Sequence, residues 1–176
     1  VELIFDEEKK LISKRARLIT HEEAEHIPPD VSVLQVIEQV EQEQEAVLSE
    51  VIGASSVRLE GEREFVRTGE TNLGNLIVDA LLDITGAEVA MMNGGGIRAS
   101  IEAGEITKGD VITVLPFGNY IVIKEVKGAD LKAALENGAS AYPDPKGAFP
   151  HVGGMRYKID AERPPGNRVY DIFAAG

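Results

Sequence analysis

Apolar residues near the start of the chain fall into two short runs, Val1–Phe5 and Leu11–Ile19, with charged residues between them. Short extended runs joined by a polar turn, here Asp6–Lys10, are typical of a β-hairpin. The stretch that follows, His21–Asp30, is polar and contains two adjacent prolines, which interrupt regular structure. The pattern therefore predicts a hairpin followed by a linker.

A helical period begins at Asp30 and continues to about Ile52. Apolar residues recur there at the spacing of one helix face, at Val33, Val36, Ile37, Val40, Val47, Leu48 and Val51. Asp30 and Ser32 are available as caps at the start of this helix. Its middle, Glu41–Glu45, is polar on all sides, which favours a solvated helix that connects two bodies. An acidic patch that binds a partner is the alternative interpretation.

After Gly53 the pattern alternates between strand-like and helix-like segments. The extended segments are Ser56–Leu59, Glu88–Met92 and Tyr120–Val126, and the helical ones are Leu73–Ile84, Val111–Leu115 and Ala129–Ala139. Two further strands, Met155–Ile159 and Arg168–Phe173, flank a turn of two prolines and a glycine. Strands interleaved with helices predict an α+β (mixed α/β) fold, and we expect its sheet to be incomplete within these residues.

The charge of the chain narrows the range of partners. Acidic residues number 30 and basic residues 18, which gives a formal net charge of −12. A field of this sign repels nucleic acid and anionic membranes, so we expect neither as a partner. A small phosphate-bearing ligand is still allowed, because a few converging arginines can reverse the potential locally. No run of apolar residues approaches the roughly 20 that a membrane helix requires.

The residue inventory also limits the chemistry. There is no cysteine, which excludes disulfides, thiolate metal sites and cysteine nucleophiles. His21 and His26 lie five positions apart, whereas the zinc-protease motif needs histidines four apart on one helix face. We therefore expect neither a metal site nor a catalytic residue in this chain.

Three consecutive glycines follow the predicted strand Glu88–Met92, within the segment Asn93–Arg98. Glycine allows positive φ and lets a ligand approach the backbone, so that successive N–H groups can face an anion or the polar edge of a ring. Asn93 and Arg98 flank this bare backbone, which makes the segment a candidate binding loop. A flexible tight turn without a ligand is the alternative.

The same glycines formally satisfy the dinucleotide-binding fingerprint, as Gly94-x-Gly96-x-x-Ala99. That fingerprint must open a helix, whereas the segment after Ala99 is short and is broken by Gly104. A dinucleotide-binding oxidoreductase domain is therefore kept only as an alternative.

Phe117 lies between a proline and a glycine, directly before the predicted strand Tyr120–Val126. A ring in this position can stack on a nucleic-acid base, although a core residue is the plainer interpretation.

Arg63 and Arg67 lie four residues apart among acids, ahead of a helix that Thr71 or Asn72 can cap. Surface salt bridges are the plainer interpretation of these two arginines. The apolar positions 73, 76, 77, 80, 81 and 84 predict the buried face of the helix.

In combination, these segments resemble the C-terminal domain of the 5'-nucleotidase family. The likeness rests on Arg67–Ala80, on Asn93–Arg98 and on Leu115–Asn119, in that order and spacing, and it extends from about Gly53 to the end of the chain. It implies the four-layer α/β fold of that domain. It further implies that residues 1–29 are the tail of a metallophosphatase domain, residues 30–52 a connecting helix and residues 53–176 the substrate-binding domain.

The resemblance also implies roles for individual residues. Phe117 would stack on the base, Asn93 would hydrogen-bond the base, and Arg98 with Arg67 would hold the ribose and phosphate. The resemblance extends the candidate substrate-binding set to Gly95, Gly96 and Arg63, with Gly96 giving access to the backbone.

The resemblance implies further partners and a cellular location. The activity would be hydrolysis of nucleoside 5'-phosphates by two divalent metal ions, Zn, Mn or similar, held by an N-terminal metallophosphatase domain whose motifs this chain lacks. Without that domain we expect no hydrolysis by the chain itself, and a non-catalytic nucleoside-binding module is the alternative function. Relatives in the family imply an extracytoplasmic location. An unfinished sheet edge would also allow a second copy of the chain to pair with it.

Overall fold

The computed structural model describes residues 1–174, and these divide into two compact units, residues 1–44 and the residues from 45 onward. The division of the chain at residues 29 and 52 that the sequence suggests stays a prediction.

The first unit begins with the predicted hairpin. Strand β1 (Glu2–Phe5) pairs antiparallel with β2 (Leu11–Arg15), with Glu2 opposite Arg15. The turn is closed by the Asp6 carboxylate, which accepts the backbone N–H of Lys10 at 2.8 Å. The expected linker is in part helical, because Thr20 caps the one-turn helix α1 (His21–Ala24) through a reciprocal pair of hydrogen bonds with Glu23.

The predicted long helix is present as α2 (Val31–Leu48), which has no buried residue. Asp30 caps it as expected, since its carboxylate accepts the N–H of Ser32 at 2.8 Å. Ser32 is not itself the cap, because its hydroxyl donates to the same carboxylate. The helix ends earlier than predicted, and Ile52 belongs to the strand that follows.

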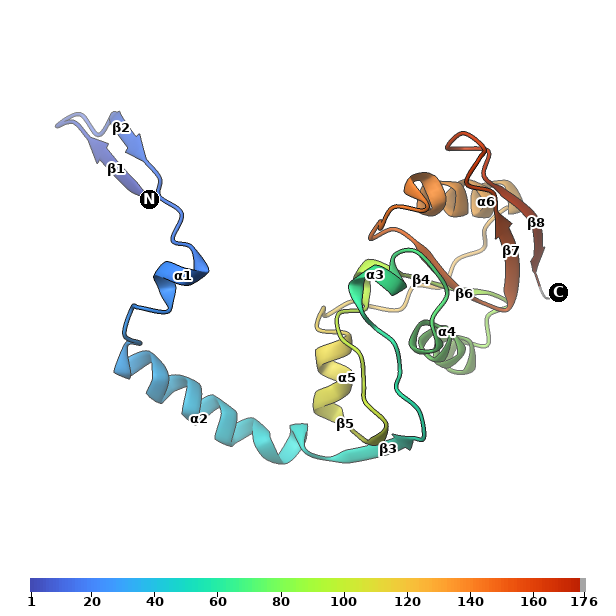
Figure 1. Cartoon of the computed structure of the whole chain (residues 1–176), viewed down its shortest axis with the longest axis horizontal. Coiled ribbons are helices and arrows are strands. Elements are labelled where there is room, and N and C mark those ends of the chain that lie inside the picture. Colours follow the sequence, from blue (N-terminus) through green and yellow to red (C-terminus); the bar gives the residue numbers. More distant parts are fainter. Residues whose placement is uncertain (175–176) are drawn as a thin grey trace. The chain divides into compact units, whose positions relative to one another are not determined.

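The second unit contains helices and antiparallel strands in alternation, as the mixed fold class requires (Figure 1). Its helices are α3 (Arg63–Val66), α4 (Asn72–Thr85), α5 (Lys108–Val114) and α6 (Gly128–Gly138), with 3₁₀ turns η1 (Gly94–Gly96) and η2 (Ala139–Ala141). Its strands are β3 (Val51–Ser55), β4 (Ala90–Asn93), β5 (Gly104–Thr107), β6 (Pro150–Gly153), β7 (Met155–Ile159) and β8 (Val169–Ala174).

Three antiparallel ladders connect these strands. Strand β3 pairs with β5, β4 with β6, and β7 with β8. The strand predicted at Ser56–Leu59 forms five residues earlier, and only Leu59 makes an isolated bridge, with Ile101. Strands β5 and β6 were not predicted from the sequence.

Two clusters of buried apolar residues form the core of this unit. One contains Leu59, Val66, Leu73, Ile97, Ile101 and Val114, and the other Leu135, Ala139 and Val169. In the first cluster Val66 precedes Arg67 and Ile97 precedes Arg98. Burial of these two neighbours therefore fixes the backbone from which both arginines extend.

Helix α4 lies beside β4 and β6 (Figure 1), but its buried face differs from the predicted one. Leu73 and Val78 are buried, whereas Leu76 is 49% exposed and Ile84 72% exposed. The periodic pattern located the helix correctly. It could not tell which apolar residues the sheet covers and which lie on the open side.

The predicted strand Tyr120–Val126 is absent, although its residues have high strand propensity. Its backbone makes no hydrogen bond with any residue from 1 to 174, and its side chains are exposed, up to 93% at Tyr120. A strand exists only when a neighbour supplies the other half of its ladder. The described residues supply none, so the segment has no regular structure.

Candidate functional site

Arg67 extends from the end of the short helix α3, next to the fully buried Val66. Its Nε atom is buried and has no hydrogen-bond partner among residues 1–174. Burial and, after it, the charges of Arg63 and Arg98 lower the pKa of the Arg67 guanidinium. The guanidinium groups of Arg63 and Arg67, on one segment, and of Arg98, on another, are therefore close enough for their charges to interact.

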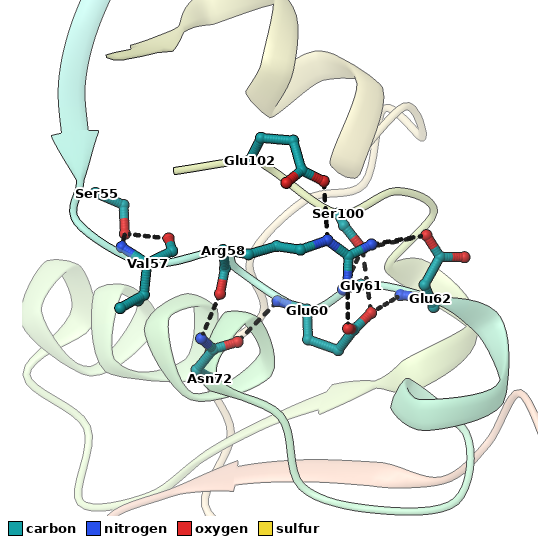
Figure 2. A network of polar contacts seen from close by, with 9 residues as sticks. All are labelled: Ser55, Val57, Arg58, Glu60, Gly61, Glu62, Asn72, Ser100 and Glu102. Atoms are coloured by element: carbon teal, nitrogen blue, oxygen red, sulfur yellow. Dashed lines mark hydrogen bonds and ion pairs between the residues drawn. The ribbon is translucent and has the colours of Figure 1, made fainter. Parts of the chain in front are cut away.

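No carboxylate from residues 1–174 lies within 4.0 Å of the guanidinium of Arg67 or Arg98. Three acids close to these arginines in the sequence, Glu60, Glu62 and Glu102, pair with Arg58 instead (Figure 2). The guanidinium Nε of Arg58 is 2.8 Å from Glu102. The interpretation of Arg67 as part of a surface salt-bridge network is therefore wrong. It is also wrong for Arg63, because its guanidinium pairs with no carboxylate of α3 or of the Arg58 network.

The Arg58 network also connects the segments that carry the three arginines (Figure 2). The Asn72 side chain accepts the N–H of Glu60 at 2.7 Å and donates to the carbonyl of Arg58 at 2.8 Å. The Ser100 hydroxyl accepts the N–H of Gly61 at 2.9 Å. A Cβ atom at Gly61 would collide with the backbone of Ala99, so only glycine permits this close approach.

The glycine loop is built differently from the expected anion cradle. The N–H of Gly94 donates to Phe149 O and that of Gly95 to Gly147 O, each at 2.8 Å. These two N–H groups are thus already used within the protein. None of the three glycines has positive φ. Gly94 and Gly95 are required because a Cβ would collide with the backbone, that of Val66 in the case of Gly94 and that of Gly147 in the case of Gly95, whereas a Cβ at Gly96 would meet only the end of the Met92 side chain.

Asn93 is exposed at the end of β4, directly before this loop. Its side-chain Nδ2 donates to Gly147 O at 3.0 Å. This bond fixes the orientation of the amide. It leaves the Oδ1 atom and one N–H for a ligand.

The dinucleotide-binding alternative fails on geometry. Its fingerprint requires the glycines to open an α-helix whose N-terminus binds the pyrophosphate. Here the glycines form the single 3₁₀ turn η1, and the chain then extends toward the bridge at Ile101. No α-helix begins between residues 97 and 107.

Phe117 is 51% exposed and does not belong to the core, contrary to the plainer interpretation of its sequence. The guanidinium carbon of Arg98 lies 5.8 Å from the centre of its ring, a cation–π contact. Arg98 is in turn held by its own N–H, which donates to Val114 O at 2.9 Å. The exposed ring and the arginine cluster are therefore adjacent.

Phe117 and Gly96 also line an apolar cavity of about 720 Å³. Its other walls include Ile77 of α4, Met92 of β4 and Leu131 of α6. None of the three arginines lines it. The cavity is therefore suited to apolar groups, whereas the positive charge lies with the arginines.

Sequence reasoning missed His151, which is 2% exposed on β6 and lies 2.9 Å through Nε2 from the carbonyl of Val66. It also missed Gly147, whose carbonyl accepts from both Asn93 and Gly95. No motif spacing marks either residue. The close packing of glycines against them is visible only in three dimensions.

Residues 1–174 contain no group of three or more His, Cys, Asp or Glu side chains placed to hold a metal ion. Among the same residues no helix is both long enough and apolar enough to span a membrane.

Comparisons with known proteins identify the family of the chain. The profile of the family described as "5'-nucleotidase, C-terminal domain" matches residues 51–175. The chain is 40% identical over 98% of its length to the trifunctional nucleotide phosphoesterase YfkN of Bacillus subtilis, and 44% identical over 64% of its length to the protein UshA of Escherichia coli.

A solved structure gives the same result. The crystal structure of a 5'-nucleotidase precursor from Thermus thermophilus superimposes on 98% of the chain with a TM-score of 0.77, at 42% identity. The chain spans only 12% of YfkN, 20% of UshA and 34% of the Thermus protein. Sequence, fold and profile agree, and the chain belongs to the 5'-nucleotidase C-terminal domain family.

Proposed function

We propose that this chain is the nucleotide-recognition domain of a metal-dependent 5'-nucleotidase that converts nucleoside 5'-phosphates to nucleoside and phosphate. The observation that carries the proposal is the arginine cluster. Arg67 has a buried, unpaired Nε and is repelled by Arg63 and Arg98, without a carboxylate nearby. Such an arrangement is unfavourable in the free protein and is relieved by an anionic ligand.

The exposed ring of Phe117 supplies the second half of the proposed site. It lies beside Arg98, so a ligand that stacks on the ring would place its phosphate or ribose within reach of the guanidinium groups. The Oδ1 atom and the remaining N–H of Asn93 would hydrogen-bond the base. Gly95 and Gly96 would contribute shape, because the N–H of Gly95 is already bonded to Gly147.

The chemistry of the hydrolysis would lie outside this chain. A pair of divalent metal ions in a separate metallophosphatase domain would activate water and neutralise the phosphoryl oxygens. This domain would position the nucleotide against them, which lowers the entropic part of the barrier. We accordingly expect no phosphate release when the purified chain is incubated with adenosine 5'-monophosphate (AMP) and Mn²⁺ or Zn²⁺.

Titration of the isotopically labelled chain with AMP, adenosine and inorganic phosphate tests the proposal, with amide shifts followed by NMR. Phe117→Ala removes the proposed stacking partner and should weaken AMP binding roughly 5- to 100-fold, as expected for a stacked base. Phe173→Ala is the matched control. Phe173 is 55% exposed and lies 4.9 Å from the Arg156 guanidinium, so it provides the same type of contact elsewhere.

The outcomes separate the readings of the site. Shifts that include Asn93, Arg98 and Phe117, lost in Phe117→Ala and kept in Phe173→Ala, support the proposal. If these amide resonances shift with inorganic phosphate and AMP causes no further shifts, the site binds an anion but does not recognise the base. A well-dispersed spectrum that does not respond to any of the three ligands would refute the function.

A non-catalytic nucleotide-binding protein is the second candidate, and the arginine cluster supports it equally. Phosphate release by the complete protein, measured with added divalent metal, distinguishes the two. An intact protein that binds AMP and releases no phosphate would favour the second candidate.

We also propose that a second copy can pair with the chain along the exposed segment Tyr120–Val126. Seven residues of high strand propensity are unpaired there, and two-fold antiparallel pairing of all seven would place Ile123 opposite Ile123 of the other copy. Sedimentation velocity at increasing concentration, with Ile123→Lys as the disrupting variant, tests this. A monomer at every concentration would refute it.

An extracytoplasmic location is a further proposal that rests on the family alone.

A further inference from the structure

The most deeply buried ionisable side chain next to the proposed site has no role in the function proposed above. His151, on β6, is 2% exposed, and its Nε2 lies 2.9 Å from the carbonyl oxygen of Val66. Val66 is fully buried and is the residue directly before Arg67. The ring is therefore bonded to the backbone that carries the central arginine of the cluster.

The hydrogen bond fixes which form of the imidazole is present. A carbonyl oxygen only accepts, so Nε2 carries the proton and donates it to Val66. The other nitrogen, Nδ1, is buried and has no partner among residues 1–174. It lies against the backbone of Gly74 so closely that a Cβ atom there would collide with it.

Gly94 completes this contact from the other segment of the site. A Cβ at Gly94 would collide with the same Val66 carbonyl that His151 binds, and the N–H of Gly94 donates to Phe149 O at 2.8 Å. The Val66 carbonyl is thus enclosed between a ring and a glycine. Elements α3, η1 and β6 meet at this carbonyl, and α4 lies against the ring that binds it.

The surroundings favour the neutral ring. Nδ1 faces the first turn of α4, where the helix dipole is positive and where Thr71 caps the N–H of Gly74. Burial lowers the pKa of His151, and the bond to Val66 and the charge of Glu70 only partly oppose it. A proton on Nδ1 would be a buried donor without an acceptor.

We propose that His151 is a positioning residue, whose neutral ring holds the Val66 carbonyl, and so Arg67, against the glycine loop that leads to Arg98. The proposal rests on the proposed function in one respect, that the arginines bind the phosphate-bearing ligand. The alignment of the two segments is a property of the free protein and can be measured without a ligand. His151 itself contacts no ligand in this scheme.

Two variants separate the hydrogen bond from the shape of the ring. His151→Gln keeps an N–H that can donate to Val66, whereas His151→Phe keeps the ring volume and removes the donor. In the ligand-free chain, amide exchange at Gly94 and the Nε–H resonance of Arg67 report the alignment of the two segments. Titration with AMP then reports its effect on binding.

We expect His151→Phe to speed amide exchange at Gly94 and to weaken AMP binding, each by about tenfold. This is the effect expected from the loss of one hydrogen bond to a buried carbonyl. His151→Gln should stay within about threefold of the wild type, because the bond is retained. Equal behaviour of the two variants would overturn the proposal, since it would mean that only packing matters. If the wild type does not bind AMP, the proposed function fails, and the ligand-free exchange rates still decide the role of His151.

Discussion

Substitution of Arg67 by methionine should weaken ligand binding and at the same time leave the fold as stable as before, or more stable. Methionine keeps a flexible apolar stem of similar length and removes the guanidinium. The wild-type Nε is a buried donor without a partner, and Arg63 and Arg98 repel the group. Both costs are removed by the substitution.

The magnitude follows from these terms. An unsatisfied buried donor costs about 1–3 kcal/mol. Part of the gain is offset by lost contacts of the guanidinium, so we expect the free energy of unfolding to rise by about 1 kcal/mol and the melting temperature by roughly 2–4 °C. Loss of hydrogen bonds to a charged ligand should weaken AMP binding on the order of 10- to 100-fold.

Thermal unfolding and NMR titration of the same samples measure both effects. Arg156→Met is the matched control, because Arg156 makes a cation–π contact with Phe173 instead of lying in a cationic cluster. The control should neither stabilise the fold nor weaken AMP binding. A loss of more than about 1 kcal/mol of stability in Arg67→Met would refute the reasoning, since such a loss would mean that Arg67 serves the fold.

Three other predictions concern stability and exposure. The pKa of His151 is lowered in the folded state, so the unfolded chain binds more protons than the folded one as the pH decreases below about 6.5. The free energy of unfolding should therefore fall over this range. Urea unfolding should show a smaller pH dependence in His151→Gln than in the wild type. Gly94→Ala should destabilise the fold by about 1–3 kcal/mol because its Cβ meets Val66, whereas Gly118→Ala, with open space around it, should be neutral. Backbone amides of Tyr120–Val126 should exchange with solvent at nearly unprotected rates in a dilute sample, and strong protection there would show that the segment is paired.

The sequence predicted best those elements that local chemistry determines. Helix α4 was found because Thr71 caps it and its apolar residues are periodic, and the hairpin of β1 and β2 because a charged turn separates two apolar runs. Strands β5 and β6 were missed because they are short and owe their pairing to residues far along the chain. The strand predicted at Tyr120–Val126 is wrong for the opposite reason, because these residues have high strand propensity but no partner strand among residues 1–174.

The candidate site was predicted in its residue types but not in its construction. The glycine triplet was recognised, yet its purpose is close packing against Val66 and Gly147 and not the presentation of N–H groups. Arg63 and Arg67 lie among acids in the sequence, and only the fold reveals that two of these acids, Glu60 and Glu62, pair with Arg58. A sequence gives the neighbours along the chain, whereas the charge balance of a site depends on neighbours in space.

The two polar groupings of this domain have complementary roles. Arg58 is surrounded by three carboxylates and holds the segment before α3 to the segment after Arg98. Arg67 lies in the opposite environment, with two cations and no carboxylate, on the backbone that the first grouping holds in place. Since like charges separate when the chain is free to move, such a cluster persists only where packing and the Arg58 network hold it. A ligand with a phosphate would therefore meet guanidinium groups that are already in position, and the cost of bringing them together would belong to folding and not to binding.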